Sequence, residues 1–206
     1  MNDLTRSTEA ETAVAASYAA RQRKAQPNGW WGAALLVATE TALFGSLVAT
    51  YFFLANQAPS WPPPGVEAPK PALPLALTGV LVLTTIPMFL AARAGRRGSV
   101  RAARLWVLPA LAVQCGYLAT QVVLFSHDLS KFSPRDSAYG SIYFTLLAVH
   151  HAHVVVGILL SAWLVSRLAF GLTNYRLIAL RVVALYWYFV AAVGVLVVLT
   201  QLSPAL

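Results

Sequence analysis

Residues 138–166 read AYGSIYFTLLAVHHAHVVVGILLSAWLVS, an apolar run without a single Asp, Glu, Lys or Arg. A helix needs about 20 residues to cross about 30 Å of hydrocarbon, and this run is longer than that. A strand of a membrane barrel would be about ten residues long and would alternate polar with apolar side chains. The continuous run therefore predicts a transmembrane helix.

Four more apolar runs of spanning length lie at residues 30–54, 73–92, 105–126 and 182–202. Hydrophobic residues make up 58% of the 206 residues and charged residues only 11%, against about 25% in a soluble domain. This composition excludes a soluble enzyme. We predict an all-α polytopic membrane protein, a bundle of five transmembrane helices over residues 30–206 after a cytoplasmic tail over residues 1–29. Two prolines inside the second and third runs should kink these helices; they are Pro87 and Pro109.

The distribution of Lys and Arg predicts the orientation in the membrane. Twelve of the fifteen basic residues lie in the tail, in the loop after the second run and in the loop after the fourth run. Positive charge favours the cytoplasmic side, so we expect the N-terminus inside and the C-terminus outside. The loop after the second run holds Arg93, Arg96, Arg97, Arg101 and Arg104. These five either bind anionic lipid headgroups or only set the topology. Because the basic residues lie between apolar runs, no nucleic-acid partner is expected.

Glu40 is the only acidic residue inside any of the runs, about 15 Å from the inner boundary. An ionisable group in the membrane is costly, so the Glu40 side chain should face protein or water. Glu40 is then either a residue that relays protons or contacts a partner, or a neutral acid that is hydrogen-bonded to another helix. His150 should lie at a similar depth, and we predict a polar contact between Glu40 and His150, extended by His153 one turn further inward. The alternative is a separate partner for each group, such as Thr39 or Thr145.

All four histidines lie on or beside the fourth run, namely His127, His150, His151 and His153. His150 and His153 should share a helix face because they are three residues apart. A haem held by two histidines needs one on an opposing helix, and a copper or zinc site needs further ligands beyond the lone Cys115. We therefore expect no haem or metal on this chain. Structural hydrogen bonding and proton handling remain as roles for the histidines.

Two other residue classes suggest how the helices pack. Aromatic residues near the ends of the runs are typical of belts at the membrane interface, and they include Trp30, Trp31, Tyr51, Trp61, Tyr139, Tyr143, Tyr186, Trp187 and Tyr188. The density of the last three also suggests a packing contact. Small residues permit close approach of helices, either within the bundle or with a larger membrane partner, and they include Gly32, Gly45, Ser46, Gly157, Ser161 and Gly194.

Several segments, in this order, resemble subunit III of haem–copper respiratory oxidases. The first run from Trp30 to Phe44 is similar to the helix of that family that carries a glutamate, here Glu40. Three later motifs also resemble the family: Trp61-Pro62-Pro63-Pro64-Gly65, then Ala138-Tyr139-Gly140-Ser141 followed by His150-His151-Ala152-His153-Val154, and finally Tyr186-Trp187-Tyr188-Phe189-Val190. Five spans resemble the short bacterial form, which lacks the first two of seven helices. Tyr188 and Ala191 stand where the family usually has His and Asp.

The resemblance implies a non-catalytic, cofactor-free subunit of a proton-pumping terminal oxidase in a bacterial inner membrane. Such an oxidase is a translocase that reduces oxygen to water with electrons from cytochrome c or quinol. Its partners would be catalytic subunit I and subunit II, which carry haem and copper, together with phospholipid; a respiratory supercomplex stays open. The expected role is to pack on the catalytic subunit, hold lipids and support proton uptake and integrity. The alternatives are an accessory subunit of nitric oxide reductase and an independent small transporter.

Overall fold

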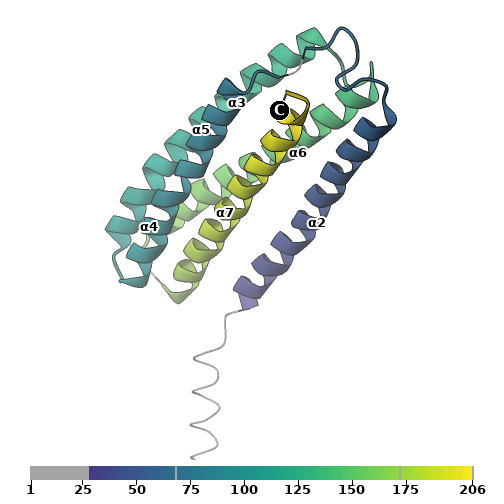
Figure 1. The fold of residues 1–206 in the computed structure, drawn as a ribbon. Coiled ribbons are helices and arrows are strands. Elements are labelled where there is room, and N and C mark those ends of the chain that lie inside the picture. Colours follow the sequence, from purple (N-terminus) through teal and green to yellow (C-terminus); the bar gives the residue numbers. More distant parts are fainter. Residues whose placement is uncertain (1–27, 68, 172, 206) are drawn as a thin grey trace, which may run out of the picture.

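The computed structural model describes residues 28–67, 69–171 and 173–205. Within these residues the chain is helical without strands, and Figure 1 shows the helices lying roughly side by side in one bundle. The elements are α2 (Asn28–Gln57), α3 (Ala72–Leu83), α4 (Thr85–Arg96), α5 (Val100–Lys131), α6 (Ala138–Leu168), α7 (Asn174–Leu202) and the short 3-10 helix η1 (Ser203–Ala205). Of the predicted tail, residues 1–27 lie outside the described residues, whereas Asn28 and Gly29 already belong to α2.

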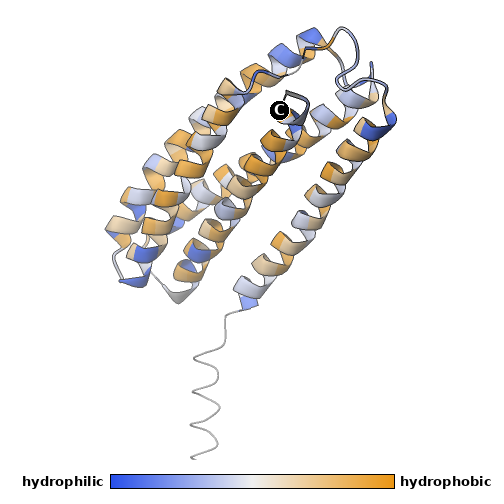
Figure 2. Ribbon diagram, viewed as in Figure 1, coloured by the Kyte–Doolittle hydropathy of each residue, from blue (hydrophilic) through white to orange (hydrophobic). Residues whose placement is uncertain are grey.

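The prediction of five membrane spans is confirmed. Five helical segments are long and apolar enough to cross a membrane, with α3 and α4 together forming one of them, Ala72–Arg96. Figure 2 shows apolar residues along the lengths of the helices. The spans are longer than predicted, most of all α5, which begins five residues before and ends five residues after its apolar run. Ser99 caps α5, accepting a hydrogen bond from the Ala102 amide at 3.4 Å.

The two intramembrane prolines have different effects on their helices. Proline lacks an amide hydrogen, and its ring clashes with the carbonyl four residues earlier, which for Pro87 is the carbonyl of Leu83. The helix is interrupted directly after Leu83, at Thr84, and resumes as α4. The predicted distortion of the second span is therefore present. Pro109, in contrast, lies inside α5, which continues through it as one helix.

The bundle has two ends with different chemistry. The basic end holds the start of α2, the α4–α5 turn over residues 97–99 and residues 169–171 and 173 between α6 and α7. The proline-rich end holds residues 58–67 and 69–71 between α2 and α3, the loop over residues 132–137 and the end of α7. The described chain therefore begins and ends at opposite ends of the bundle.

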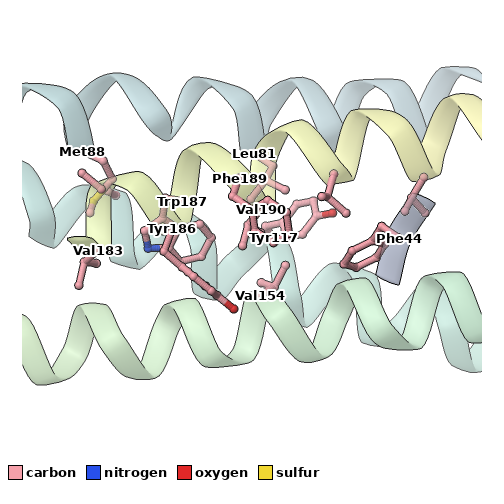
Figure 3. Close-up of a cluster of buried hydrophobic side chains, with 14 of the residues drawn as sticks. Phe44, Leu81, Met88, Tyr117, Val154, Val183, Tyr186, Trp187, Phe189 and Val190 are labelled. Carbon is pink, nitrogen blue, oxygen red and sulfur yellow. The ribbon is translucent and has the colours of Figure 1, made fainter. Parts of the chain in front are cut away.

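Helix α7 is the centre of the bundle. Its backbone approaches α2, α3, α4 and α6, and Figure 3 shows its side chains among residues from the surrounding helices. Trp187, at the middle of α7, is fully buried. In the described residues, α2 approaches only α6 and α7, and α5 does not approach α7. The outer helices thus enclose α7 incompletely.

The predicted aromatic belt is wrong for several of its members, whereas the packing contact expected of Tyr186 and Trp187 is confirmed. Their rings lie inside the bundle because they pack against one another and against neighbouring helices rather than against lipid headgroups. The buried members are Tyr51, Tyr139, Tyr143, Tyr186 and Trp187. Trp31, in contrast, is more than half exposed, as expected of a belt residue.

The small residues divide into two groups. A Cβ atom added to Gly157 would lie 2.8 Å from the Trp187 ring, and one added to Gly194 would lie 3.1 Å from the His150 ring. These glycines on α6 and α7 therefore serve packing inside the bundle. A Cβ added to Gly32 or Gly45 on α2 would meet no atom within 4 Å. The small residues of α2 thus face away from the described helices.

Candidate functional site

The side chains of Glu40 and His153 join α2 to α6. Glu40 Oε2 lies 3.1 Å from His153 Nε2, and the two side chains are 26% and 15% exposed. Among the described residues this is the single carboxylate–histidine ion-pair contact. The predicted contact between Glu40 and His150 is wrong: the neighbour of Glu40 is His153, the residue predicted only to extend the contact.

The hydrogen bonds of His153 fix which ring nitrogen carries a proton. Its Nδ1 lies 2.7 Å from the carbonyl oxygen of Val149, one helical turn earlier. A carbonyl can only accept, so Nδ1 is the donor in that bond. The bond to Glu40 then needs one more proton, which lies either on the carboxyl group or on Nε2. In both arrangements the pair has no net charge, which is the inexpensive state within a membrane.

Neighbouring side chains hold His153 in this position. Its ring makes edge contacts with Phe44 on α2, at a centroid distance of 5.2 Å, and with Phe189 on α7, at 6.1 Å. The Tyr186 hydroxyl of α7 donates to the backbone carbonyl of His153 at 3.1 Å. Three helices thus converge on the Glu40–His153 pair, and Tyr186 links the pair to the centre of the bundle.

His150 belongs to a different environment. It is 2% exposed, and its Nε2 lies 3.4 Å from the hydroxyl of Tyr117 on α5. Its Nδ1 is buried without a hydrogen-bond partner in the described part of the chain. A spacing of three residues leaves two side chains about 60° apart around a helix. This angle is enough to turn His150 toward α5 while His153 faces α2.

A row of buried polar side chains on α5 was not predicted. Gln121 donates to the Tyr117 hydroxyl at 3.1 Å, and Gln114 donates to Thr84 at 3.4 Å. The signal in the sequence is the spacing of these residues at positions 114, 117 and 121, which places polar groups on one face of an apolar helix. Tyr117 and Gln121 thus meet His150 of α6, and Gln114 meets Thr84 at the junction of α3 and α4.

The other two histidines lie apart from the Glu40–His153 pair. His127 is exposed near the end of α5, and the His151 ring lies 6.1 Å from that of Phe125. Within the described ranges, no group of three or more His, Cys, Asp or Glu side chains is placed to hold a metal ion.

The residues of the Tyr-Trp motif have separate structural roles. Trp187 Nε1 donates to the Ser161 hydroxyl at 2.8 Å, and its ring rests against Gly157. Figure 3 shows Tyr186 and Trp187 near Val154 of α6. Tyr188 is 37% exposed, whereas Ala191, the other position that departs from the family pattern, is buried.

The Trp-Pro-Pro loop is attached to the bundle by aromatic packing. The Trp61 ring makes edge contacts with Tyr51, at 5.2 Å, and with Tyr139, at 5.0 Å. Trp61 therefore connects the loop of Pro62 and Pro63 to α2 and α6. Next to Tyr139, a Cβ added to Gly140 would lie 2.5 Å from the Ser133 carbonyl oxygen, so only glycine fits without a backbone shift.

The five arginines predicted to bind lipid headgroups lie together at the basic end. Arg93 and Arg96 are in the last turn of α4, Arg97 follows it, and Arg101 and Arg104 are in the first turns of α5. The first four are exposed and Arg104 is half-buried. Gly98, with φ of +77°, makes the sharp turn that brings the two helix ends together.

Comparison with known proteins matches the family described as cytochrome c oxidase subunit III over residues 10–202. The chain is similar to cytochrome c oxidase subunit 3 of Bacillus subtilis, with 29% identity covering 82% of this chain and 81% of the relative. It is also similar to quinol oxidase subunit 3 of the same organism, with 27% identity and 82% coverage of both chains. A probable cytochrome c oxidase subunit 3 of Nocardia farcinica is 30% identical over 80% of this chain and 82% of the relative.

Proposed function

We propose, from the premise that this chain belongs to the cytochrome c oxidase subunit III family, that it serves as a non-catalytic membrane subunit of a haem–copper terminal oxidase. The observation that carries the proposal is the family match over residues 10–202, which includes every described membrane span. The relatives named above are subunits of cytochrome c oxidases and quinol oxidases, which favours an oxidase over a nitric oxide reductase or a transporter.

Co-purification tests this function. The chain, tagged and extracted in mild detergent, should purify with larger membrane chains that show a visible haem spectrum and consume oxygen. Haem and copper would belong to subunits I and II. A colourless preparation of this chain alone would refute the proposal. A coloured complex that reduces nitric oxide but not oxygen would support the alternative of an accessory subunit.

The expected orientation places the basic end in the cytoplasm and the proline-rich end outside a bacterial inner membrane. It rests on the excess of Lys and Arg in the tail and in the loops of the basic end. In this orientation the chain would begin inside and end outside.

We propose a role in proton uptake for Glu40 and His153. The pair holds a single proton in the bond between Oε2 and Nε2, and both side chains keep some exposure at the edge of the bundle. A pair of this kind can receive a proton from one side and release it without a lasting net charge. Tyr186, through the His153 carbonyl, would act as a positioning residue.

We propose that the catalytic subunit packs on the open face of α2. Helix α2 approaches only two of the described helices, and Gly32 and Gly45 leave room for close approach of another helix. In this arrangement the present chain would cover part of the catalytic subunit and support the integrity of that subunit. The five arginines of the basic end would hold anionic lipid headgroups at the rim of the complex.

A further inference from the structure

Three polar side-chain groups lie beneath the Trp-Pro-Pro loop without a partner. The Trp61 ring packs between those of Tyr51 on α2 and Tyr139 on α6, with centroid distances of 5.2 and 5.0 Å. The hydroxyls of both tyrosines and the indole nitrogen of Trp61 are buried, and none of them has a hydrogen-bond partner in the described part of the chain. Tyr51 is 0% exposed and Tyr139 is 1% exposed. Orphan polar groups from two helices and one loop are thus packed together.

The polar atoms of these side chains are neighbours that do not bond to one another. The Tyr51 hydroxyl lies near Trp61 Nε1 and Ser203 Oγ, and it is within electrostatic range of the Tyr139 hydroxyl. None of these approaches to the Tyr51 hydroxyl has the geometry of a hydrogen bond. Ser203 already donates its own proton to the Thr200 carbonyl, at 2.8 Å. Buried hydroxyl and N–H groups without partners are costly, so a ligand that completes their hydrogen bonds would stabilise this arrangement.

We propose that one ordered water molecule binds between Tyr51, Trp61 and Tyr139. The water oxygen accepts a hydrogen bond from the Trp61 N–H and one from a tyrosine hydroxyl, and the water donates a hydrogen to the oxygen of the other tyrosine. A buried water typically makes about three hydrogen bonds to groups that are otherwise unsatisfied, which matches the three groups present here. The water joins the loop at Trp61 to α2 and to α6, in addition to the ring contacts.

The chemistry of the three groups favours water over other ligands. The indole N–H of Trp61 can only donate, so it cannot bind a metal ion or an ammonium group. An anion would find no cation among the three groups, and it would lie within range of the Asp128 carboxylate, which acts electrostatically on Tyr139. The ring contacts on both sides of Trp61 exclude a larger organic ligand from the same space.

A cavity of about 640 Å³ at the proline-rich end supplies the route by which this water enters. Tyr139 lines the cavity together with Gly65 and Val66 of the same loop as Trp61. Tyr51 and Trp61 are not among the residues that line it. Water from the cavity can therefore reach Tyr139 directly, whereas Tyr51 is separated from the cavity and meets water only at the proposed site.

Hydroxyl-radical footprinting with synchrotron X-rays tests the proposal on the protein purified from membranes in mild detergent. The X-rays split water in place, the radicals oxidise the side chains beside it, and mass spectrometry gives the oxidation rate of each residue. Tyr51 should be oxidised several times faster than Tyr186. Exposure alone predicts the reverse, since Tyr51 is 0% exposed and Tyr186 is 6% exposed. The Tyr186 hydroxyl donates to the His153 carbonyl and needs no water.

Substitution of Tyr139 tests whether the three groups share one water. Tyr139→Phe removes one of the three bonds and should weaken water binding about tenfold, the factor that corresponds to one hydrogen bond of about 1.4 kcal/mol. The oxidation rate of Tyr51 should then fall toward that of Tyr186. Tyr143→Phe is the matched control, because the Tyr143 ring stacks on Tyr139 at 5.7 Å but its hydroxyl already has Asp128 as a partner. The control should leave the oxidation rate of Tyr51 unchanged.

Four outcomes would overturn the proposal. Tyr51 may be oxidised no faster than Tyr186 in the unaltered protein, or its rate may be the same in Tyr139→Phe as in the unaltered protein. An equal fall in Tyr139→Phe and Tyr143→Phe would show a general effect of the aromatic cluster, and a rise in Tyr139→Phe would show bulk water entering a loosened loop. The comparison of Tyr51 with Tyr186 needs no substitution, so it decides the question even where a variant fails to fold. Every reading comes from residues of this chain and is independent of the oxidase assignment.

Discussion

Replacement of Glu40 by Gln separates the structural role of the Glu40–His153 pair from its role in proton handling. Because His153 Nδ1 donates to the Val149 carbonyl, neutral His153 offers Nε2 as an acceptor. The side-chain amide introduced by Glu40→Gln can donate to that nitrogen, so this variant keeps the bond between α2 and α6. Glu40→Leu removes both the bond and the exchangeable proton.

The magnitude follows from the kind of bond that is lost. Hydrogen bonds between membrane helices average about 0.6 kcal/mol and reach about 1.7 kcal/mol. Loss of the 3.1 Å contact in Glu40→Leu should therefore weaken α2–α6 association by about 3- to 16-fold. Glu40→Gln should lose less than half of that free energy. Thr39→Val is the matched control, since Thr39 bonds only to the carbonyl of Leu36 on its own helix.

Two assays on the purified complex read out the two roles. Retention of this chain with its partners across a detergent series should fall for Glu40→Leu and stay near the unaltered level for Glu40→Gln and Thr39→Val. Proton uptake during turnover in vesicles should fall for both Glu40 variants and not for Thr39→Val. If Glu40→Gln releases the chain as readily as Glu40→Leu, the bond requires a charged carboxylate and the structural reasoning is refuted. Normal proton uptake in Glu40→Gln would refute the proton role.

Two further substitutions test the packing of the motif residues. Gly140→Ala places a methyl group 2.5 Å from the Ser133 carbonyl oxygen and should lower the free energy of unfolding by about 1–3 kcal/mol. The thermal midpoint of the complex should fall accordingly. Gly116→Ala is the control, because its added methyl group meets no atom within 4 Å and should not lower the midpoint. Trp187→Phe leaves the buried Ser161 hydroxyl without its donor and should cost about 1–3 kcal/mol. Ser161→Ala should destabilise the Trp187→Phe variant less than it destabilises the unaltered protein, because the hydrogen bond between the two residues is already lost. If the two losses of stability simply add, the hydrogen bond is contradicted.

The membrane spans were predictable from the sequence because run length and composition act locally. The apolar run over residues 138–166 coincides with α6 to within two residues. The end of α5 was missed because His127, Asp128 and Lys131 are polar, yet the helix continues through them beyond the apolar run. Family membership was also predictable, since the four motifs lie along one continuous match.

The partner of Glu40 was less accessible to prediction. Depth along the membrane placed Glu40 near both His150 and His153, but depth carries no information on which helices are neighbours. The choice between them depends on rotation about α6, which directs His150 toward Tyr117 and His153 toward Glu40. The aromatic residues were misplaced for a related reason. Position near the end of a run suggests an interface, whereas burial of Tyr139 and Trp187 depends on contacts distant in sequence.

The central position of α7 has a consequence for the biogenesis of the protein. Chains are made from the N-terminus, so the helix that fills the middle of the bundle leaves the ribosome after the other described spans. Until it inserts, α2 can approach only α6 among the described helices, and α3 can approach only its neighbours α4 and α5. The earlier spans can already contact one another through the pairs α4–α5, α5–α6 and α2–α6, but without α7 they surround no central helix. Insertion of α7 would then fill the axis, and a nascent chain cut short before Asn174 would lack the centre of the bundle.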